Sequence, residues 1–253
     1  MYAAGSQPTL SVCEIYASIL GESTFAGWPG VIVRLAGCPL RCTWCDTPYA
    51  RQRGEDLAFA EIIQRIQSHG FRLVLLTGGE PLAQPGSRHL VTELLNLGYQ
   101  VVIETGGGVS IQGVDPRACI VLDIKCPSSG MQERQVWENL DCLKPEDEIK
   151  FVLGSRADYE YARDFLRHSA LSERHVVHFS PVTVAERSET GETSAGSGSG
   201  PQTGETGGPR PGVGKSRGLA ARELAAWIIE DQLPVRLNLQ LHVCIWGPGK
   251  RGV

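Results

Sequence analysis

Short apolar segments, rich in β-branched residues, alternate with amphipathic segments over most of this 253-residue chain. The apolar segments are typical of buried strands, and the amphipathic segments have the periodicity of helices. Strands that alternate with helices form right-handed β-α-β units and a parallel sheet. The pattern therefore predicts an α/β fold, an open and incomplete relative of the (β/α) barrel with a mostly parallel sheet. We expect strands at 12–18, 31–36, 73–77, 101–104, 120–124, 148–153 and 176–179, and helices at 57–69, 88–97, 132–142, 157–166 and 219–230.

Two later segments depart from this alternation. Residues 185–217 are rich in Gly, Ser, Thr and Pro and contain no Leu, Ile or aromatic residue, so they cannot bury enough apolar surface to form a core. We expect a single domain over residues 1–253 with a flexible insert at about 185–217. Residues 212–216 imitate a phosphate-binding loop, but Pro209 stands where that motif requires glycine. Residues 236–242 alternate apolar and polar side chains, which predicts a strand whose polar side faces the site.

Composition limits the class of protein. A net charge of −4 argues against a broad nucleic-acid footprint. No apolar run is long enough to span a membrane, and the N-terminus lacks a basic region followed by an apolar one, so we expect a soluble, cytoplasmic protein. The eight cysteines fit a reducing compartment if three hold a metal centre; a secreted disulfide framework is the alternative.

Three cysteines, Cys38, Cys42 and Cys45, follow the second predicted strand on one short loop. Thiolates so close in sequence converge on one point, as a bound metal or cluster requires. A [4Fe–4S] cluster needs four ligands, so this loop leaves one iron open to a non-protein ligand, which indicates chemistry rather than scaffolding. A structural zinc site is the alternative and needs a fourth Cys or His. The candidates for that fourth ligand are Cys119, Cys126 and Cys244.

Polar residues near the ends of predicted strands suit a bound ligand. Arg34 interrupts an apolar strand, and a buried guanidinium requires an anion from either a ligand or the protein. Glycines after the strand at 73–77 allow close approach of a ligand, and Glu80 beside them can accept a hydrogen bond from an ammonium group. The hydroxyl of Thr47 either binds Mg²⁺ or caps the cysteine loop. His242 belongs either to the site or to the surface.

The Cys-x3-Cys-x2-Cys loop after an early strand resembles that of the radical S-adenosylmethionine (SAM) superfamily. The wider run, from Glu22-Ser23 through residues 33–38 to Cys45-Asp46-Thr47, is followed by Thr77-Gly78-Gly79-Glu80-Pro81. Together these motifs resemble one family within the superfamily, 7-carboxy-7-deazaguanine synthase of the queuosine and 7-deazapurine pathway. The similarity extends from about residue 12 to the C-terminus, apart from the insert.

The resemblance implies a radical SAM lyase that converts 6-carboxy-5,6,7,8-tetrahydropterin to 7-carboxy-7-deazaguanine with loss of ammonia, by hydrogen abstraction from C6 and ring contraction. It implies a [4Fe–4S] cluster, SAM and Mg²⁺ as cofactors, the protein supplying orientation and exclusion of water. It also implies an electron donor such as a flavodoxin or ferredoxin, and a homodimer. Two other hypotheses remain open at this point: an activase that installs a glycyl radical on a partner, and a non-enzymatic zinc or iron–sulfur module.

The resemblance also assigns residues, and no catalytic group is expected beyond the ligands of the cofactors and substrate. The cluster ligands would be Cys38, Cys42 and Cys45, and the magnesium ligand Thr47. The SAM contacts would be Trp44, Cys45, Asp46, Gly79, Glu80, Asp123, Ile124, Lys125 and Ser180. The pterin contacts would be Ile19, Leu20, Gly21, Glu22, Arg34, Thr77 and His242. Leu20 stands where relatives usually have glutamine, and the chain continues to Val253 where some relatives end, so a contact from Val253 stays open.

Overall fold

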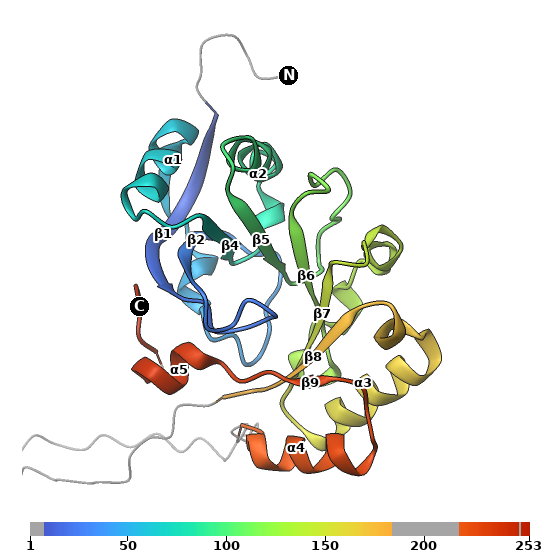
Figure 1. Ribbon diagram of the computed structural model, residues 1–253. Coiled ribbons are helices and arrows are strands. Elements are labelled where there is room, and N and C mark those ends of the chain that lie inside the picture. The colour runs from blue at the N-terminus through green and yellow to red at the C-terminus, as the bar shows by residue number, and fades with distance from the viewer. Residues whose placement is uncertain (1–7, 184–217, 248) are drawn as a thin grey trace, which may run out of the picture.

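The computed structural model describes residues 8–183, 218–247 and 249–253. Within these residues, nine strands form one open sheet in the order β3-β1-β2-β4-β5-β6-β7-β8-β9 (Figure 1). β1 pairs antiparallel with β2 and β3, and every other neighbouring pair is parallel. The predicted open, mostly parallel sheet is confirmed. The strands are β1 Thr9–Ile19, β2 Pro29–Leu35, β3 Glu55–Ala58, β4 Leu73–Gly78, β5 Gln100–Thr105, β6 Cys119–Ile124, β7 Glu148–Leu153, β8 Val176–Pro181 and β9 Arg236–Leu237.

Four helices pack on the outer face of the curved sheet: α1 Phe59–Ser68, α2 Ser87–Asn96, α3 Arg156–Ser169 and α4 Ala221–Glu230 (Figure 1). Their apolar stripes account for two buried clusters, one beneath α1 and α2 and the other beneath α3 and α4. In α1, Ile62 and Ile66 lie one turn apart and are fully buried. The predicted helices at 57–69, 88–97, 157–166 and 219–230 are therefore present, although 55–58 forms the short strand β3 instead of a first helical turn.

The helix predicted at 132–142 is wrong. The segment forms two 3₁₀ helices, η4 Gln132–Arg134 and η5 Trp137–Cys142. Asn139 is buried there, and its side-chain amide donates to the carbonyl oxygen of Val109 at 3.0 Å and accepts from the backbone N–H of Ile111 at 2.9 Å. These bonds tie the segment to the loop after β5, and this tertiary requirement overrides the local helical pattern.

The strand predicted at 236–242 is also mostly wrong. Only Arg236–Leu237 pairs, with β8, and the chain then enters α5 Leu241–Trp246. Leu237 and Leu239, the supposed buried side, are exposed. α5 carries the chain back across the carboxyl ends of the strands, so that the C-terminal residues lie near β1 and β2 (Figure 1).

The inner face of the sheet carries the polar residues. Because side chains alternate between the two faces of a strand, Arg34, Thr77, Glu104, Asp123 and Lys150 point away from the outer helices. Arg34 is in register with Thr77, and Asp123 with Lys150. An apolar inner cluster lies at their base, formed by Leu20, Ile32, Leu73, Leu75, Val102 and Val121.

Two further predictions concern the chain as a whole. Within the part of the chain that the structure describes, no helix is both long and apolar enough to cross a membrane. The insert predicted at 185–217, including its imitation of a phosphate-binding loop, lies outside the described residues.

Candidate active site

A cavity of about 570 Å³ lies at the carboxyl ends of the parallel strands, between the cysteine loop and α5. Ligand sites of α/β sheets are commonly found at this end of the strands. Most of the residues singled out in the sequence line it, and Leu20, Glu80 and Ile124 do not. Those lining it are Ile19, Gly21, Glu22, Arg34, Cys38, Cys42, Trp44, Cys45, Asp46, Thr47, Thr77, Gly79, Asp123, Lys125, Ser180 and His242.

Glu80, one of the expected SAM contacts, does not line the cavity, and its carboxylate has partners within the protein. Its side chain is completely buried and accepts hydrogen bonds from the N–H of Leu82 at 3.1 Å, the hydroxyl of Thr105 at 2.9 Å and the N–H of Gly106 at 2.8 Å. Burial raises the pKa of this carboxyl group, although the hydrogen bonds oppose the rise. Glu80 therefore joins the end of β4 to the end of β5 beneath the cavity wall.

Leu20 and Ile124 are core residues. Leu20 is 1% exposed, and its backbone bonds with Trp28 and Gly27 close the loop between β1 and β2. Ile124 is fully buried in the cluster beneath α3 and α4. Both side chains pack into apolar clusters, and the contacts expected at these two positions stay predictions.

The cysteine loop is anchored to the loop that follows β6. Thr43 Oγ1 donates to the carbonyl oxygen of Ser128 at 2.6 Å, and Trp44 Nε1 donates to Ser128 Oγ at 3.1 Å. Arg51 donates to the carbonyl oxygen of Cys42 at 3.0 Å. Hydrogen bonds from two directions thus fix the backbone on which the three thiols stand.

The donor set of this loop fits an iron–sulfur cluster. Burial raises the pKa of Cys38, and the neighbouring thiols of Cys42 and Cys45 contribute in the same direction. Among the described residues, no three His, Cys, Asp or Glu side chains are arranged to hold a single metal ion. Cys38, Cys42 and Cys45 share one cavity on one anchored loop, and their thiols are the donors that an iron–sulfur cluster requires.

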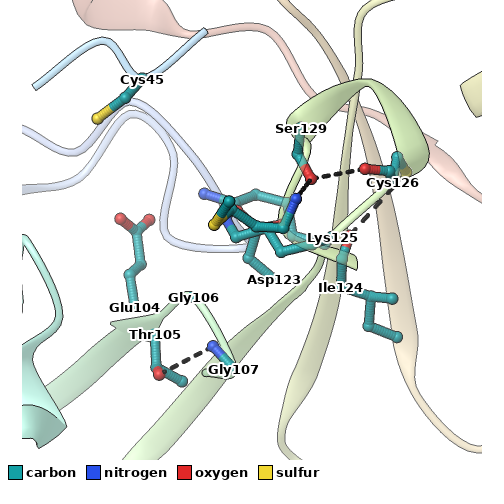
Figure 2. Close-up of polar contacts among 12 residues, drawn as sticks. Cys45, Glu104, Thr105, Gly106, Gly107, Asp123, Ile124, Lys125, Cys126 and Ser129 are labelled. Atoms are coloured by element: carbon teal, nitrogen blue, oxygen red, sulfur yellow. Dashed lines mark hydrogen bonds and ion pairs between the residues drawn. The ribbon is translucent and has the colours of Figure 1, made fainter. Parts of the chain in front are cut away.

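Asp123 and Lys125, at the end of β6, provide a cradle for a polar ligand (Figure 2). Lys125 Nζ lies 2.7 Å from Asp123 Oδ2 and 5.8 Å from the centre of the Trp44 ring. Burial by itself would lower the pKa of Lys125, but the carboxylate of Asp123 raises the pKa of Lys125 above its usual value. The second oxygen, Asp123 Oδ1, is buried and has no hydrogen-bond partner. An unsatisfied carboxylate oxygen beside the cluster loop fits a ligand with hydroxyl donors, such as the ribose of SAM.

A buried ionic group joins Glu22 to Lys150 and Glu104, two cavity residues that the sequence analysis missed. Lys150 Nζ is 2.5 Å from Glu22 Oε2, and Glu104 stands near it on β5 (Figure 2 shows Glu104 beside the end of β6). Burial opposes the charge on Lys150, but Glu104 and Glu22 hold its pKa well above the ordinary value. Burial raises the pKa of Glu104, which accepts a long 3.5 Å hydrogen bond from Thr77 Oγ1. Lys150 interrupts an apolar strand as Arg34 does, and that signal was available in the sequence.

Arg34 has a protein anion for a partner and also faces the cavity. Its Nε donates to Glu14 at 2.7 Å, and Nη2 donates to the Tyr16 hydroxyl at 3.2 Å. Glu14 also accepts from Tyr49 at 2.8 Å, and Arg251 lies 3.6 Å above the Tyr49 ring. Two guanidinium groups are therefore linked through one carboxylate and one phenol at the cavity wall.

His242 lines the cavity, but from α5 and not from a strand. The N–H of Leu241 donates to the carbonyl oxygen of Gly21 at 3.1 Å, and a Cβ atom at Gly21 would collide with His242 Nδ1. Only glycine permits this approach of α5 to the loop after β1. Val253 also lines the cavity.

The chain is similar to known proteins at two levels, a superfamily and one family within it. Residues 32–119 match the sequence profile of the radical SAM superfamily. The 7-carboxy-7-deazaguanine synthase of Koribacter versatilis is 40% identical over 96% of this chain and 100% of that protein. The chain belongs to the 7-carboxy-7-deazaguanine synthase family. The Chlorobaculum tepidum synthase is 37% identical over 98% of this chain and 99% of that protein. The crystal structure of QueE from Escherichia coli matches with a TM-score of 0.58 at 23% identity, over 69% of this chain and 85% of that chain, and shows the same fold.

Family membership decides among the hypotheses left open by the sequence. The protein is a radical SAM enzyme of queuosine biosynthesis, and it is neither a glycyl-radical activase nor a zinc module. Its cofactors are a [4Fe–4S] cluster, SAM and Mg²⁺. Three thiols on one fixed loop and the unpaired Asp123 oxygen match the first two of these groups.

Proposed function

We propose that the protein is a carbon–nitrogen lyase that converts 6-carboxy-5,6,7,8-tetrahydropterin to 7-carboxy-7-deazaguanine and ammonia. The observation that carries the proposal is one cavity in which the cysteine loop, Thr47, Arg34 and the Glu22–Lys150 pair all take part. This combination suits a radical cofactor next to a small anionic substrate with several N–H groups.

The cofactor side of the cavity is formed by the cysteine loop and the end of β6. Cys38, Cys42 and Cys45 would hold the cluster, and Asp123 Oδ1 would accept from the hydroxyl groups of SAM. When bound, the cluster and SAM supply a one-electron reduction and a hydrogen-atom abstraction. The protein fixes the direction of that abstraction because Thr43, Trp44 and Arg51 hold the loop in place.

The substrate side is formed by β2, β5 and β7. Arg34 would bind the pterin carboxylate, and Thr47 would bind Mg²⁺ beside it. Glu22 and Glu104 would accept hydrogen bonds from pterin N–H groups. The ionic partner Lys150 keeps Glu22 ionised, since burial alone would raise the pKa of that carboxyl group and Lys150 lowers it.

The proposal extends to partners and location. A soluble electron carrier such as a flavodoxin or ferredoxin would reduce the cluster, and the enzyme would act as a cytoplasmic homodimer. The net charge of −4 supports a small-molecule substrate over direct nucleic-acid binding. We also propose that residues 1–253 act as one catalytic domain, since in the described residues a single sheet, the cysteine loop and α5 together surround one cavity.

The test is an anaerobic assay with SAM, a reductant, Mg²⁺ and the carboxy-tetrahydropterin, followed by chromatography of the products. We expect 7-carboxy-7-deazaguanine from the wild type, none from Cys42→Ala, and a reduced rate from Thr47→Ala. The absorbance of the reconstituted protein near roughly 400 nm, bleached by dithionite, controls for cluster content.

Two results would distinguish a wrong substrate assignment from wrong radical chemistry. Formation of 5′-deoxyadenosine without the deazapurine would refute the substrate assignment. A colourless protein that retains zinc after anaerobic reconstitution would refute the radical chemistry as well.

A further inference from the structure

Glu148 and His178 form a buried pair that the proposed chemistry does not use. Both side chains are at most 3% exposed, and His178 Nε2 lies 2.6 Å from Glu148 Oε2. Both stand on the inner face of the sheet, Glu148 two residues before Lys150 on β7 and His178 two residues before Ser180 on β8, and Lys150 and Ser180 line the cavity. The pair therefore lies under the floor of the active site.

A third residue joins this pair to the substrate side. The N–H of Thr24 donates to Glu148 Oε2 at 3.0 Å, and the Thr24 hydroxyl donates to Glu148 Oε1. An ionised carboxylate only accepts hydrogen bonds, so His178 Nε2 is the donor in its contact with Glu148. Burial opposes the ionisation of Glu148, yet the bonds from His178 and Thr24 lower its pKa below the usual value.

Thr24 belongs to the loop between β1 and β2, and two other residues of that loop, Gly21 and Glu22, line the cavity. Glu22 pairs with Lys150 at 2.5 Å. The carbonyl oxygen of Gly21 accepts a 3.1 Å hydrogen bond from the N–H of Leu241, the first residue of α5. Between Glu22 and Thr24, Ser23 has a left-handed backbone with φ of 67°, which is unfavourable for a residue with a side chain. A strained residue persists only where its neighbours are fixed, and Glu148 fixes the neighbour on one side.

We infer that Glu148 and His178 are positioning residues that hold Glu22 and Gly21 in place for the substrate through Thr24. The inference rests on the proposed function because it takes Glu22 and Gly21 as pterin contacts. Without the anchor, the loop relaxes at Ser23, Glu22 shifts relative to Lys150, and α5 loses its contact at Gly21. Binding of the pterin then weakens while the cysteine loop and the SAM cradle keep their own anchors.

The experiment uses Glu148→Gln and Thr24→Val in the reconstituted holoenzyme. Each is expected to raise the KM for the pterin by about tenfold, the scale of one lost charge-assisted bond. The KM for SAM and the cluster absorbance should stay at wild-type values. The amount of 5′-deoxyadenosine released per deazapurine should rise, since a poorly placed substrate intercepts fewer radicals. Thr24→Ser retains the hydroxyl donor and should restore the wild-type KM.

Asp147→Asn is the matched control, because Asp147 is a buried carboxylate that pairs with Lys144 at 2.5 Å and does not line the cavity. It should lower the thermal midpoint without changing the KM for the pterin. If Glu148→Gln and Thr24→Val behave like Asp147→Asn, the inference is wrong. Thr24→Val changes a residue at the rim of the fold, so it remains informative if Glu148→Gln does not fold.

A wild-type enzyme that makes no deazapurine would refute the proposed function, and hydrogen exchange then decides the anchoring on its own. Faster exchange of residues 21–28 in Glu148→Gln than in Asp147→Asn would support it, and equal exchange in the two variants would overturn it.

Discussion

Replacement of Lys150 by methionine would expose the energetics of the buried ionic group. The side chains of Lys150 and Glu22 are only 10% and 11% exposed, and the carboxyl group of Glu104 also raises the pKa of Lys150. Removal of one partner of a buried pair leaves an uncompensated charge and costs about 3–5 kcal/mol. For a protein of this size about 1 kcal/mol shifts the melting temperature by roughly 2–4 °C, so we expect Lys150→Met to lower it by about 6–20 °C near pH 7.5.

The same substitution should make stability depend on pH in a defined direction. In the wild type Lys150 lowers the pKa of Glu22, so this contribution is present above the unfolded-state pKa and is lost only in strong acid. In Lys150→Met, burial without a cation raises the pKa of Glu22 above its unfolded value, and the folded state takes up a proton as the pH falls. The difference between the two proteins should therefore shrink between pH 7.5 and about pH 5.

Differential scanning fluorimetry of the anaerobically reconstituted proteins measures both effects. Glu22→Leu combined with Lys150→Met removes both charges of the pair and should recover part of the loss. Arg53→Met serves as the control, because Arg53 forms an exposed pair with Asp56 and should shift the midpoint far less. A shift under about 2 °C for Lys150→Met, or one that is independent of pH, would refute the reasoning.

Three further predictions concern SAM, Mg²⁺ and the packing of the cysteine loop. Asp123→Asn should weaken SAM binding by about tenfold in equilibrium dialysis with unchanged cluster absorbance, because the unpaired oxygen loses its charge; an unchanged Kd would contradict the cradle. Thr47→Ala should raise the Mg²⁺ concentration for half-maximal rate, and Thr47→Ser should restore it; an equal Mg²⁺ requirement in the wild type and Thr47→Ala would contradict a magnesium ligand at Thr47. Gly79→Ala should cost about 1–3 kcal/mol in thermal unfolding, since a Cβ atom there would collide with the carbonyl oxygen of Gly37, and an unchanged midpoint would show that the two loops separate freely.

The cysteine loop and the strand–helix alternation were readable from the sequence because both are local. Spacing alone places Cys38, Cys42 and Cys45 on one loop, and apolar periodicity alone indicates which segments become β4 to β8. Arg34 was recognisable because a charged residue in an apolar strand requires a partner. The family resemblance rested on the same local runs, and the comparisons confirm it.

Tertiary structure decided which face of each segment meets the cavity. Glu80, predicted from local sequence as a SAM contact, does not line the cavity; its carboxylate caps the 3₁₀ helix Pro81–Ala83 and accepts from Thr105 at the end of β5. His242 reaches the cavity from a helix, since β9 ends after two residues and the chain turns toward Gly21. Lys150 forms its ion pair with Glu22, which is 128 residues away in the chain, so the local sequence does not indicate the partner. Local sequence carries periodicity and ligand spacing, whereas charge pairing across the sheet depends on strand order and register, which no short segment specifies.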